Sequence, residues 1–172
     1  MRPFTFIALN DWDFLEFTIK SYRDHDGVTN ALDKLVVGDE LIIHDVWGAI
    51  HYEAPGLFIA GGAGVTPFIA IFRYLQKKNQ IEGNKFLFAN KTSKDIILKT
   101  EFEQILGSNF YNVLSDEKVD GYHHGFINED ILKQHLKADD FIYVCGPPPM
   151  MDAVQLNLDK LGFSDKKVIV EL

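Results

Sequence analysis

Beyond residue 55, short apolar runs alternate with longer helical patterns, and this alternation constrains the fold more than any other feature of the sequence. The apolar runs predict buried strands at 57–60, 85–89, 111–114, 141–144 and 167–170. The segments between them predict helices at 67–78, 94–106 and 128–136, and a proline-opened helix that ends at Gly162. Strands and helices that alternate at this spacing form right-handed βαβ units with parallel strands. We therefore predict an α/β fold with a five-stranded, doubly wound parallel sheet.

The first 55 residues have a different pattern, typical of antiparallel strands joined by close turns. The predicted elements are strands at 2–9, 14–21 and 40–44 and a short helix at 29–35. This region holds ten acidic and four basic side chains, so it carries most of the chain's net charge of −8. We therefore expect two regions, 1–55 and 56–172.

The composition excludes several classes of protein. The chain has 172 residues, of which 47% are hydrophobic and 24% charged, as in folded globular proteins. No apolar run approaches the length of a membrane span, and no signal peptide opens the chain. The single cysteine, Cys145, excludes an internal disulfide framework, so we expect a cytoplasmic protein. An acidic chain without a basic stripe argues against nucleic-acid and anionic-membrane binding.

The segment Gly61-Gly62-Ala63-Gly64-Val65-Thr66-Pro67 lies between a predicted buried strand and a predicted helix. In that position a glycine loop brings backbone N–H groups against a pyrophosphate at a helix N-terminus. Thr66 is the expected N-cap, and Pro67 the first helical residue, although Pro67 stands where the dinucleotide fingerprint has its third glycine. The alternative is a tight turn that binds no ligand.

Cys145-Gly146-Pro147-Pro148-Pro149-Met150 follows the fourth predicted strand, at the end where open α/β sheets bind ligands. For Cys145, a ligand-facing position and a small buried core position are both open. Two shorter motifs, Arg2-Pro3-Phe4-Thr5 and Gly27-Val28-Thr29-Asn30, are compatible on their own with an amphipathic strand and a helix cap.

The remaining polar pairs suggest no chemistry. His123-His124 has no further ligand at metal spacing, so we predict no metal site. Asp116-Glu117 and Asp139-Asp140 are expected to be solvated loop charges.

Five motifs occur in one order along the chain: RPFT, IKSYRDHDGVTNAL, GDELIIHDVWG, GGAGVTP and CGPPPM. Together they resemble the ferredoxin–NADP reductase family, and most closely its bacterial flavodoxin or ferredoxin reductase-like members. The resemblance spans essentially the whole chain. It implies a partial antiparallel β-barrel that binds flavin over 1–55, followed by an NAD(P)-binding domain over 56–172.

The resemblance implies an FAD site in the first region. Arg2 would pair with the FAD pyrophosphate, Phe4 would stack on the isoalloxazine ring where the family usually has tyrosine, and Thr5 would hydrogen-bond to flavin N5. The residues implied to lie along FAD or to hold its phosphate are Ile19, Lys20, Ser21, Tyr22, Gly27, Val28 and Thr29.

The resemblance also implies a nicotinamide nucleotide site in the second region. The residues of its phosphate loop are Gly62, Gly64, Thr66 and Pro67, and those that set the nicotinamide against the flavin are Cys145, Gly146 and Pro147. Ser115 would approach the adenosine. Thr5 and Cys145 are therefore the implied catalytic residues.

The coenzyme is open between NADPH and NADH. The run from Asn90 and Lys91 to Lys94, after the second predicted strand, offers two lysines and no acid before Asp95, which favours NADPH. A lysine run after a strand can also be a solvated loop.

The implied activity is hydride transfer from NAD(P)H to FAD, followed by transfer of single electrons to a carrier such as flavodoxin or ferredoxin. An acidic carrier needs a basic docking face, and the acidic character of residues 1–55 weakens that choice. Diffusible acceptors and a heme or iron–sulfur partner stay open.

The sequence departs from the family at its start, since family members begin with further residues that form the first strands of the flavin barrel. We therefore expect the chain either to bind FAD weakly or to complete the barrel through a partner chain, for example as a homodimer. The alternatives are a non-catalytic nucleotide-binding or subunit-interaction module, and a shortened chain with no separate role.

Overall fold

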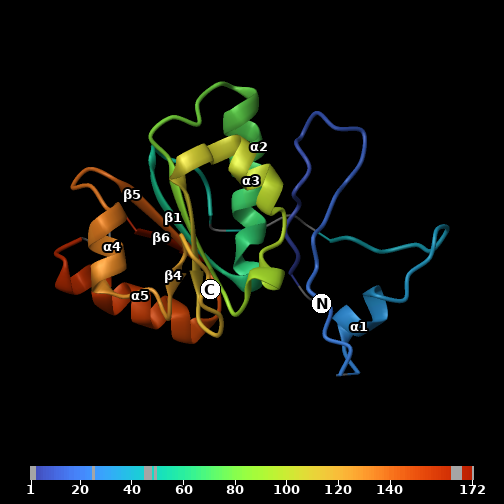
Figure 1. Ribbon diagram of the computed structural model, residues 1–172. Helices are drawn as coiled ribbons and strands as arrows, with labels where there is room; N and C mark the ends of the chain where they lie inside the picture. Colours follow the sequence, from blue (N-terminus) through green and yellow to red (C-terminus); the bar gives the residue numbers. More distant parts are fainter. Residues whose placement is uncertain (1–2, 25, 45–47, 49, 164–167, 172) are drawn as a thin grey trace.

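The computed structural model describes residues 3–24, 26–44, 48, 50–163 and 168–171 (Figure 1). Arg2, for which we predicted a role at FAD, lies outside these residues. The described residues from 56 onward form one sheet with helices on both faces, and the described residues before 56 lie beside it. No helix within the described ranges has the length and apolar character needed to cross a membrane.

The sheet has six parallel strands in the order β4-β3-β2-β1-β5-β6. They are β1 (Gly56–Gly61), β2 (Lys85–Asn90), β3 (Phe110–Leu114), β4 (His123–His124), β5 (Phe141–Cys145) and β6 (Val168–Glu171). The predicted α/β class and doubly wound parallel sheet are confirmed. The predicted number of strands is one too low, because β4 has only two residues, both histidines, and such a strand carries no apolar pattern.

Two helices cover each face of this sheet (Figure 1). α2 (Thr66–Lys77) and α3 (Lys99–Leu106) cover one face, and α4 (Glu129–His135) and α5 (Pro148–Lys160) cover the other. Phe58 of β1 packs in the core under α2 and α3, whereas its neighbours Leu57 and Ile59 pack under α4 and α5. Because both faces are covered, every residue of β1 is buried.

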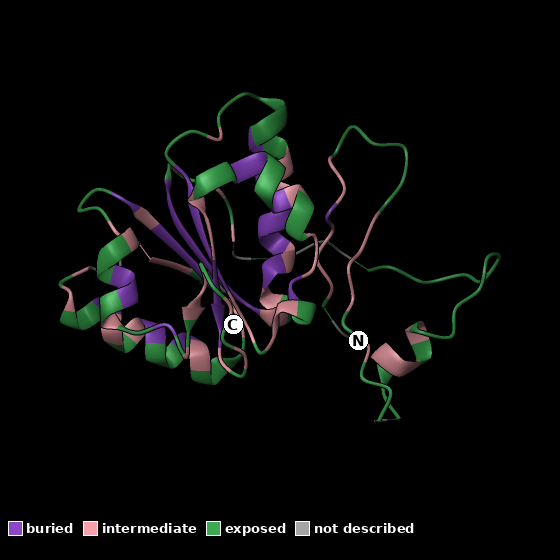
Figure 2. Ribbon diagram, in the orientation of Figure 1, coloured by how far each residue is buried: buried purple, intermediate pink, exposed green. Residues whose placement is uncertain are grey.

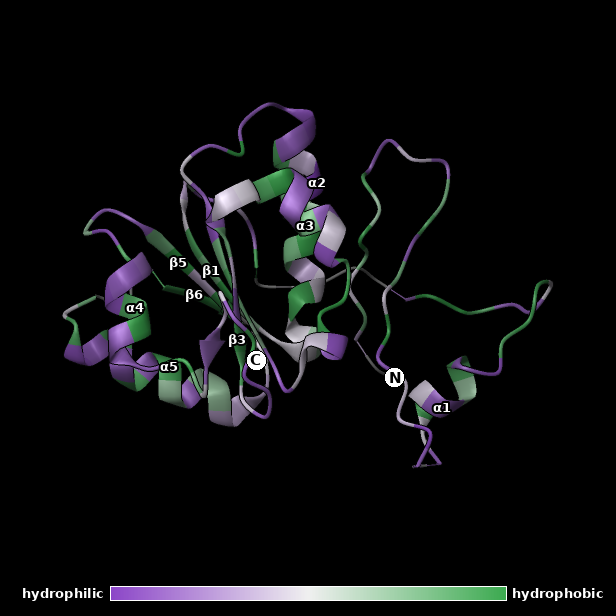
Figure 3. Ribbon diagram, in the orientation of Figure 1, coloured by the Kyte–Doolittle hydropathy of each residue, from purple (hydrophilic) through white to green (hydrophobic). Residues whose placement is uncertain are grey.

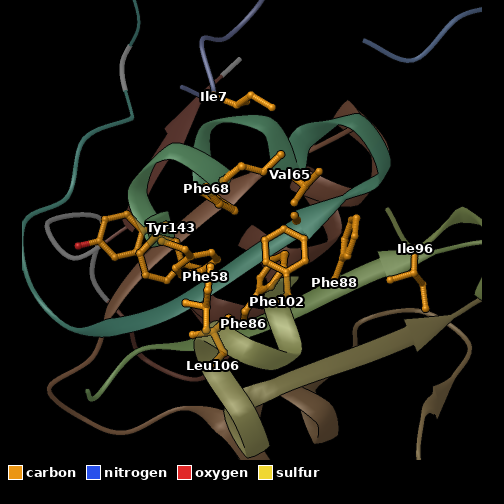
Figure 4. Close-up of a cluster of buried hydrophobic side chains, with 14 of the residues drawn as sticks. Ile7, Phe58, Val65, Phe68, Phe86, Phe88, Ile96, Phe102, Leu106 and Tyr143 are labelled. Carbon is orange, nitrogen blue, oxygen red and sulfur yellow. The ribbon is translucent and has the colours of Figure 1, made fainter. Parts of the chain in front are cut away.

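Aromatic rings fill the core on the side of α2 and α3 (Figure 4). The ring of Phe58 stacks on Tyr143 with centroids 4.2 Å apart, and it meets Phe72 edge-on at 4.7 Å. Phe86 meets Phe102 of α3 at 5.1 Å. Large buried rings contribute strongly to core stability, so this cluster anchors α2 firmly on the sheet.

The helix that we predicted over 94–106 begins at Lys99. Before it lies a short 3-10 turn, Ser93–Asp95, because the Asp95 carboxylate accepts hydrogen bonds from the backbone N–H and hydroxyl of Thr92 and closes a capping box. Leu98 then takes a left-handed φ of 50°, which separates the turn from α3. The predicted cap of α4 is confirmed, since the Asn128 side chain accepts a hydrogen bond of 2.9 Å from the N–H of Ile131.

Residues 3–55 form much less regular structure than we predicted. In the described part, the strands expected at 2–9 and 14–21 meet at one isolated antiparallel bridge, Phe6 to Phe17, and the strand expected at 40–44 is absent. The helix expected at 29–35 is reduced to α1 (Val28–Leu32). Within the described residues, one bridge is therefore all that corresponds to the predicted partial barrel.

The physical reason is the lack of pairing partners for these strands. A strand needs neighbours for its backbone N–H and C=O groups and a covered face for its apolar side chains. Several large apolar side chains of this segment face solvent instead, including Phe14, Val36 and Ile42 (Figures 2 and 3). The apolar alternation that predicted strands is present in the sequence, but among the described residues no layer covers side chains such as Phe14, Val36 and Ile42.

Candidate functional site

The candidate site lies at the carboxyl ends of β1 and β5, where the strand order of the sheet changes direction. β1 pairs with β2 on one side and with β5 on the other. In open α/β sheets this switch point is where ligands bind. The glycine loop, 61–66, leaves β1 there, and the Cys145-Gly146-Pro147 turn leaves β5 beside it.

The two turns are in direct backbone contact, and glycine is required at the contact. A Cβ on Gly64 would stand 2.3 Å from the carbonyl oxygen of Cys145 and 2.6 Å from the Cα of Gly146. A Cβ on Gly61 would stand 2.5 Å from the sulfur of Met150. Gly64, Cys145 and Gly146, predicted as parts of one site from distant stretches of sequence, are therefore brought together.

The glycine loop forms a short 3-10 helix, Gly62–Val65, that continues directly into α2. Gly62 has a φ of +52°, a left-handed conformation that glycine adopts without strain. The prediction that Thr66 is the N-cap is wrong: Val65 is the cap, and the Thr66 hydroxyl donates to the carbonyl oxygen of Ala63 at 3.1 Å. Pro67 stands in the first turn of α2, close to its predicted position.

A cavity of about 220 Å³ opens beside this loop. It is lined by Thr18, Ile19, Lys20, Gly62, Ala63, Thr66, Asn90, Lys94, Asp95 and Ile97. The predicted flavin residues Ile19 and Lys20 thus share one cavity with the predicted nucleotide residues Gly62, Thr66 and Asn90. The Nδ2 atom of Asn90 is buried and has no hydrogen-bond partner among the described residues, so a donor is available at this wall.

Thr5 also reaches the glycine loop. Its hydroxyl oxygen lies 3.5 Å from that of Thr66, although 61 residues separate the two along the chain. The implied catalytic residue of the first region is therefore in contact with the first residue of α2.

The other predicted site residues that the structure describes do not line the cavity. They are Phe4, Thr5, Ser21, Tyr22, Gly27, Val28, Thr29, Gly64, Pro67, Lys91, Ser115, Cys145, Gly146 and Pro147. Gly27 precedes α1, which Figure 1 shows projecting away from the sheet. The Ser115 hydroxyl donates to Asp116 at 2.5 Å.

Sequence reasoning did not assign three residues of the cavity wall to the site, namely Thr18, Asp95 and Ile97, whereas Lys94 is one of the two lysines expected to favour NADPH. Thr18 directly precedes Ile19 in the predicted strand, so extending that strand motif by one residue would have found it. The sequence presents Asp95 only as the acid that follows the lysines. Ile97 gives no signal, because it looks like one apolar position of the predicted helix.

Carboxylates accompany the lysines after β2. Hydrogen bonds from Thr92, and more weakly the charges of Lys20 and Lys91, hold the pKa of Asp95 below its usual value. Glu117 accepts a hydrogen bond of 2.6 Å from the N–H of Ser93, which lowers the pKa of its carboxyl group. The turn at 91–95 therefore carries both signs of charge.

Of the two histidines in β4, one contacts a histidine of α4 and the other contacts the backbone. The Nε2 of His123 lies 3.0 Å from the Nε2 of His135 in α4, whereas the Nδ1 of His124 meets the carbonyl oxygen of Glu117 at 3.1 Å. Within the described ranges, no group of three or more His, Cys, Asp or Glu side chains is arranged to hold a metal ion.

Comparison with known proteins places the chain among the reductases. The family model described as the oxidoreductase NAD-binding domain matches residues 58–156. NADH-cytochrome b5 reductase 1 of Homo sapiens is 30% identical over 96% of this chain and 68% of its own length. NADH-cytochrome b5 reductase 2 of Mus musculus is 27% identical over 99% of this chain and 76% of its own length.

Solved structures share the architecture. The flavohem-like FAD/NAD-binding domain of nitric oxide dioxygenase from Vibrio cholerae superposes with a TM-score of 0.63 at 27% identity, over 71% of this chain and 52% of that one. The ferredoxin NADP+ reductase from Neisseria gonorrhoeae, solved with FAD and NADP, gives a TM-score of 0.76 over 99% of this chain and 78% of that one. At 15% identity, the second likeness shows the fold alone.

Proposed function

Because the chain belongs to the oxidoreductase NAD-binding family, among the flavoprotein reductases that use NADH or NADPH, we propose that it transfers hydride from a nicotinamide nucleotide to FAD and passes electrons singly to a protein acceptor. In this proposal residues 1–55 contribute to the flavin site and residues 56–172 bind the nucleotide. The chain spans about two thirds of its human relative and about half of the Vibrio cholerae structure, so the activity is proposed for this chain together with whatever completes its flavin site.

One observation carries the proposal: the glycine loop after β1 rests on the Cys145-Gly146 backbone at the switch point of the sheet. Glycine at position 64 lets the loop lie directly on the Cys145-Gly146 turn, since a Cβ there would stand 2.3 Å from the carbonyl oxygen of Cys145, and the buried Nδ2 of Asn90 offers a donor nearby. Both features suit a phosphorylated nucleotide that lies along the loop.

The side chains have separate tasks in this reaction. The N–H groups at the start of α2 bind phosphate, the Cys145 turn orients the nicotinamide, and the Thr5 hydroxyl lies beside the Thr66 end of the loop to hydrogen-bond the flavin. FAD, when bound, supplies the hydride acceptor and releases electrons one at a time. Ile19 and Lys20 on the cavity wall suit that cofactor, whereas Gly27–Thr29 lie apart from the cavity.

NADH is the coenzyme best supported by the surroundings of the second strand. Lys91 and Lys94 would favour a 2′-phosphate, but Asp95 and Glu117 stand beside them and would repel it. The relatives from Homo sapiens and Mus musculus are named for NADH. The ratio of kcat/KM for NADH and NADPH tests this choice, and Lys91→Glu should lower the NADPH rate selectively.

The acceptor is a one-electron protein carrier. The relatives are named for cytochrome b5, which adds a small heme protein to flavodoxin and ferredoxin as candidates. The acidic charge of residues 1–55 favours an acceptor with a basic docking face. Salt dependence of the reduction rate with each purified carrier distinguishes them, because electrostatic steering weakens with ionic strength.

The experiment that tests the proposal is reconstitution with FAD, followed by anaerobic titration with NADH while the flavin absorbance is recorded. Bleaching of bound flavin and NADH-driven reduction of an artificial one-electron acceptor are the expected results. Bound FAD that NADH does not bleach contradicts the proposal, whereas protein that retains no FAD through gel filtration on its own favours the partner-dependent candidate described below.

A second candidate is a nucleotide-binding module that holds FAD only together with a partner chain. It is favoured by the exposed apolar side chains of residues 12–43. A partner, such as a second copy, would cover them and complete the barrel. Gel filtration with light scattering decides this point, because a monomer that retains FAD stoichiometrically needs no partner.

A further inference from the structure

One face of α2 is attached to the N-terminal segment at three points. Thr66, Arg73 and Lys77 are spaced by seven and four residues, so they lie on one stripe of the helix. Thr66 meets Thr5, Arg73 binds Ile7 and Glu16, and Lys77 pairs with Asp11. The stripe that begins at the glycine loop is therefore the surface on which residues 5–16 dock.

Arg73 is largely buried at its contact, with 13% of its side chain exposed, against 46% for Lys77. Its Nη1 donates to the backbone carbonyl of Ile7 at 2.8 Å and to the Glu16 carboxylate at 2.6 Å. Its Nε and Nη2 donate to the two oxygens of Glu101 in α3, at 2.6 and 3.1 Å. The planar guanidinium thus donates four hydrogen bonds in fixed directions. The ammonium group of a lysine cannot reproduce this geometry.

The bond to Ile7 fixes the backbone near Thr5. Ile7 is 1% exposed and packs in the aromatic core with Val65 and Phe68, as Figure 4 shows. Its N–H donates to the carbonyl oxygen of Glu16 at 2.9 Å. The N-terminal segment is therefore held at Ile7 by the core, by the backbone of Glu16 and by Arg73.

We infer that Arg73 is a positioning residue for hydride transfer, which fixes the segment that carries Phe4 and Thr5 against the nicotinamide loop at the start of α2. This inference rests on the proposed function, in which Thr5 lies at the flavin and Thr66 at the nucleotide. The rate of hydride transfer depends strongly on the distance between the reacting atoms, and a misplacement of about 1 Å can lower it about 100-fold. A rigid contact two turns along α2 keeps that distance constant while the nucleotide enters and leaves.

The test compares Glu16→Gln, which keeps the shape of the side chain but removes its charge, with Lys77→Met. Lys77 and Asp11 also join α2 to the same segment, but both side chains are about half exposed, so their pair contributes little. Stopped-flow reduction of bound FAD at increasing NADH concentration gives the limiting rate and the NADH dissociation constant separately. Arg73→Lys is measured alongside.

We expect Glu16→Gln and Arg73→Lys to lower the limiting rate of flavin reduction about ten-fold, with the NADH dissociation constant changed by less than about two-fold. With NADH deuterated at C4, the isotope effect on the observed rate should rise toward its intrinsic value in these variants. Lys77→Met should match the wild type in both quantities. Equal limiting rates in all four proteins overturn the inference.

Amide hydrogen exchange of the protein without cofactors separates this inference from the proposed function. Exchange at residues 4–9 should become faster in Glu16→Gln and Arg73→Lys, and should not change in Lys77→Met. A wild-type protein that oxidises no NADH contradicts the proposed function. Unchanged exchange at residues 4–9 contradicts the positioning role of Arg73 whatever the activity.

Discussion

Gly62 and Gly64 are required in the same loop for different reasons. Gly62 needs a left-handed backbone but has open space around its Cα, whereas Gly64 has no space for a side chain. Gly64→Ala would place a methyl group against the Cys145 backbone and push the two turns apart. We expect it to weaken NADH binding at least ten-fold and to lower stability by about 1–3 kcal/mol, measured by titration and urea unfolding.

Gly62→Ala is the matched control for this prediction. It introduces the same methyl group with backbone strain of about 1–2 kcal/mol but without a clash. Its effect on NADH affinity should be clearly smaller than that of Gly64→Ala. Equal losses of affinity in the two variants would show that the contact with Cys145 does not shape the site.

His135 links the stability of the domain to pH. Burial, then the neighbouring His123 and Lys85, lower the pKa of His135 from 6.5 to about 4. Between pH 6.5 and 4, His135 is therefore protonated in the unfolded chain but neutral in the folded chain. The stability that depends on the neutral side chain is fully present above pH 6.5 and is lost as the pH falls toward 4. We expect a loss of about 2 kcal/mol over this range in urea unfolding, after allowing for partial solvent screening.

His135→Asn should flatten this part of the stability profile, because it removes the titrating group. His44→Gln, at an exposed position of the N-terminal segment, is the matched control and should leave the profile unchanged. Carboxylates with lowered pKa values, such as Asp33, lose their contribution only at more acidic pH. A profile between pH 6.5 and 4 that is the same in wild type and His135→Asn would contradict the prediction.

Site residues were predictable where backbone chemistry demands one residue type. Gly64 and Gly146 stood out because a phosphate loop and a rigid strand exit need glycine. The solvated loop charge expected at Asp140 is wrong: this side chain is 7% exposed and pairs with Lys85, 55 residues earlier. A contact between such distant residues depends on strand order, which one sequence does not state.

At the scale of elements, the pair of Lys85 and Asp140 joins β2 to the loop between α4 and β5. The Lys85 Nζ donates to Asp140 at 2.7 Å and to the carbonyl oxygen of His135, the last residue of α4, at 2.5 Å. Asp140 also accepts a hydrogen bond of 2.8 Å from the N–H of Lys137. Asp140→Asn would leave a buried ammonium without its counterion, and should cost about 3–5 kcal/mol in urea unfolding.

Glu129→Gln is the control for Asp140→Asn, because it removes the charge of an ion pair that is exposed instead of buried. Glu129 and Lys133 form an exposed pair on α4 at 2.5 Å, and such helix pairs contribute about 0.3–0.5 kcal/mol. If the two variants lost the same stability, burial of the Lys85 and Asp140 pair would have no energetic consequence.

The longer strands of the sheet were predictable from their apolar runs, whereas the start of α3 was not. Every strand from β1 to β3, together with β5 and β6, was found within two residues because its apolar run is bounded by turn residues. The start of α3 was placed five residues early, because Lys94–Leu106 is apolar at helical spacing but Asp95 binds back to Thr92. A side chain that competes for the backbone in this way overrides periodicity.

At the scale of the whole molecule, the two regions differ in how well they are protected. Leu41 and Ile42 are exposed, and the backbone of 33–44 belongs to no helix or strand. Limited chymotrypsin digestion should therefore cut first between residues 12 and 44, at exposed side chains such as Phe14, Tyr22 and Leu41, and leave a resistant fragment that contains the sheet. Heat-unfolded protein, the control, should also be cut at Phe58 and Phe86, and first cuts within α2 or the sheet in native protein would contradict the prediction.

The α/β class of the molecule followed from the sequence, whereas the state of its first region did not. The apolar pattern of a segment indicates which side chains need burial, and this holds for residues 14–21 as well as for β1. It does not report whether a covering layer is present, and the Phe6–Phe17 bridge is what the described part of this region forms in its absence.

The central position of β1 also sets an order of events during synthesis. β1 is translated first among the strands, yet one of its edges stays open until β5 leaves the ribosome, since Gly56 pairs with Phe141. At about 5–20 residues per second, this wait is roughly 4–17 s. During it the apolar run Leu57–Ala60 has an exposed edge that other chains can join. A nascent chain of this protein is therefore a natural client for chaperones that bind short apolar segments.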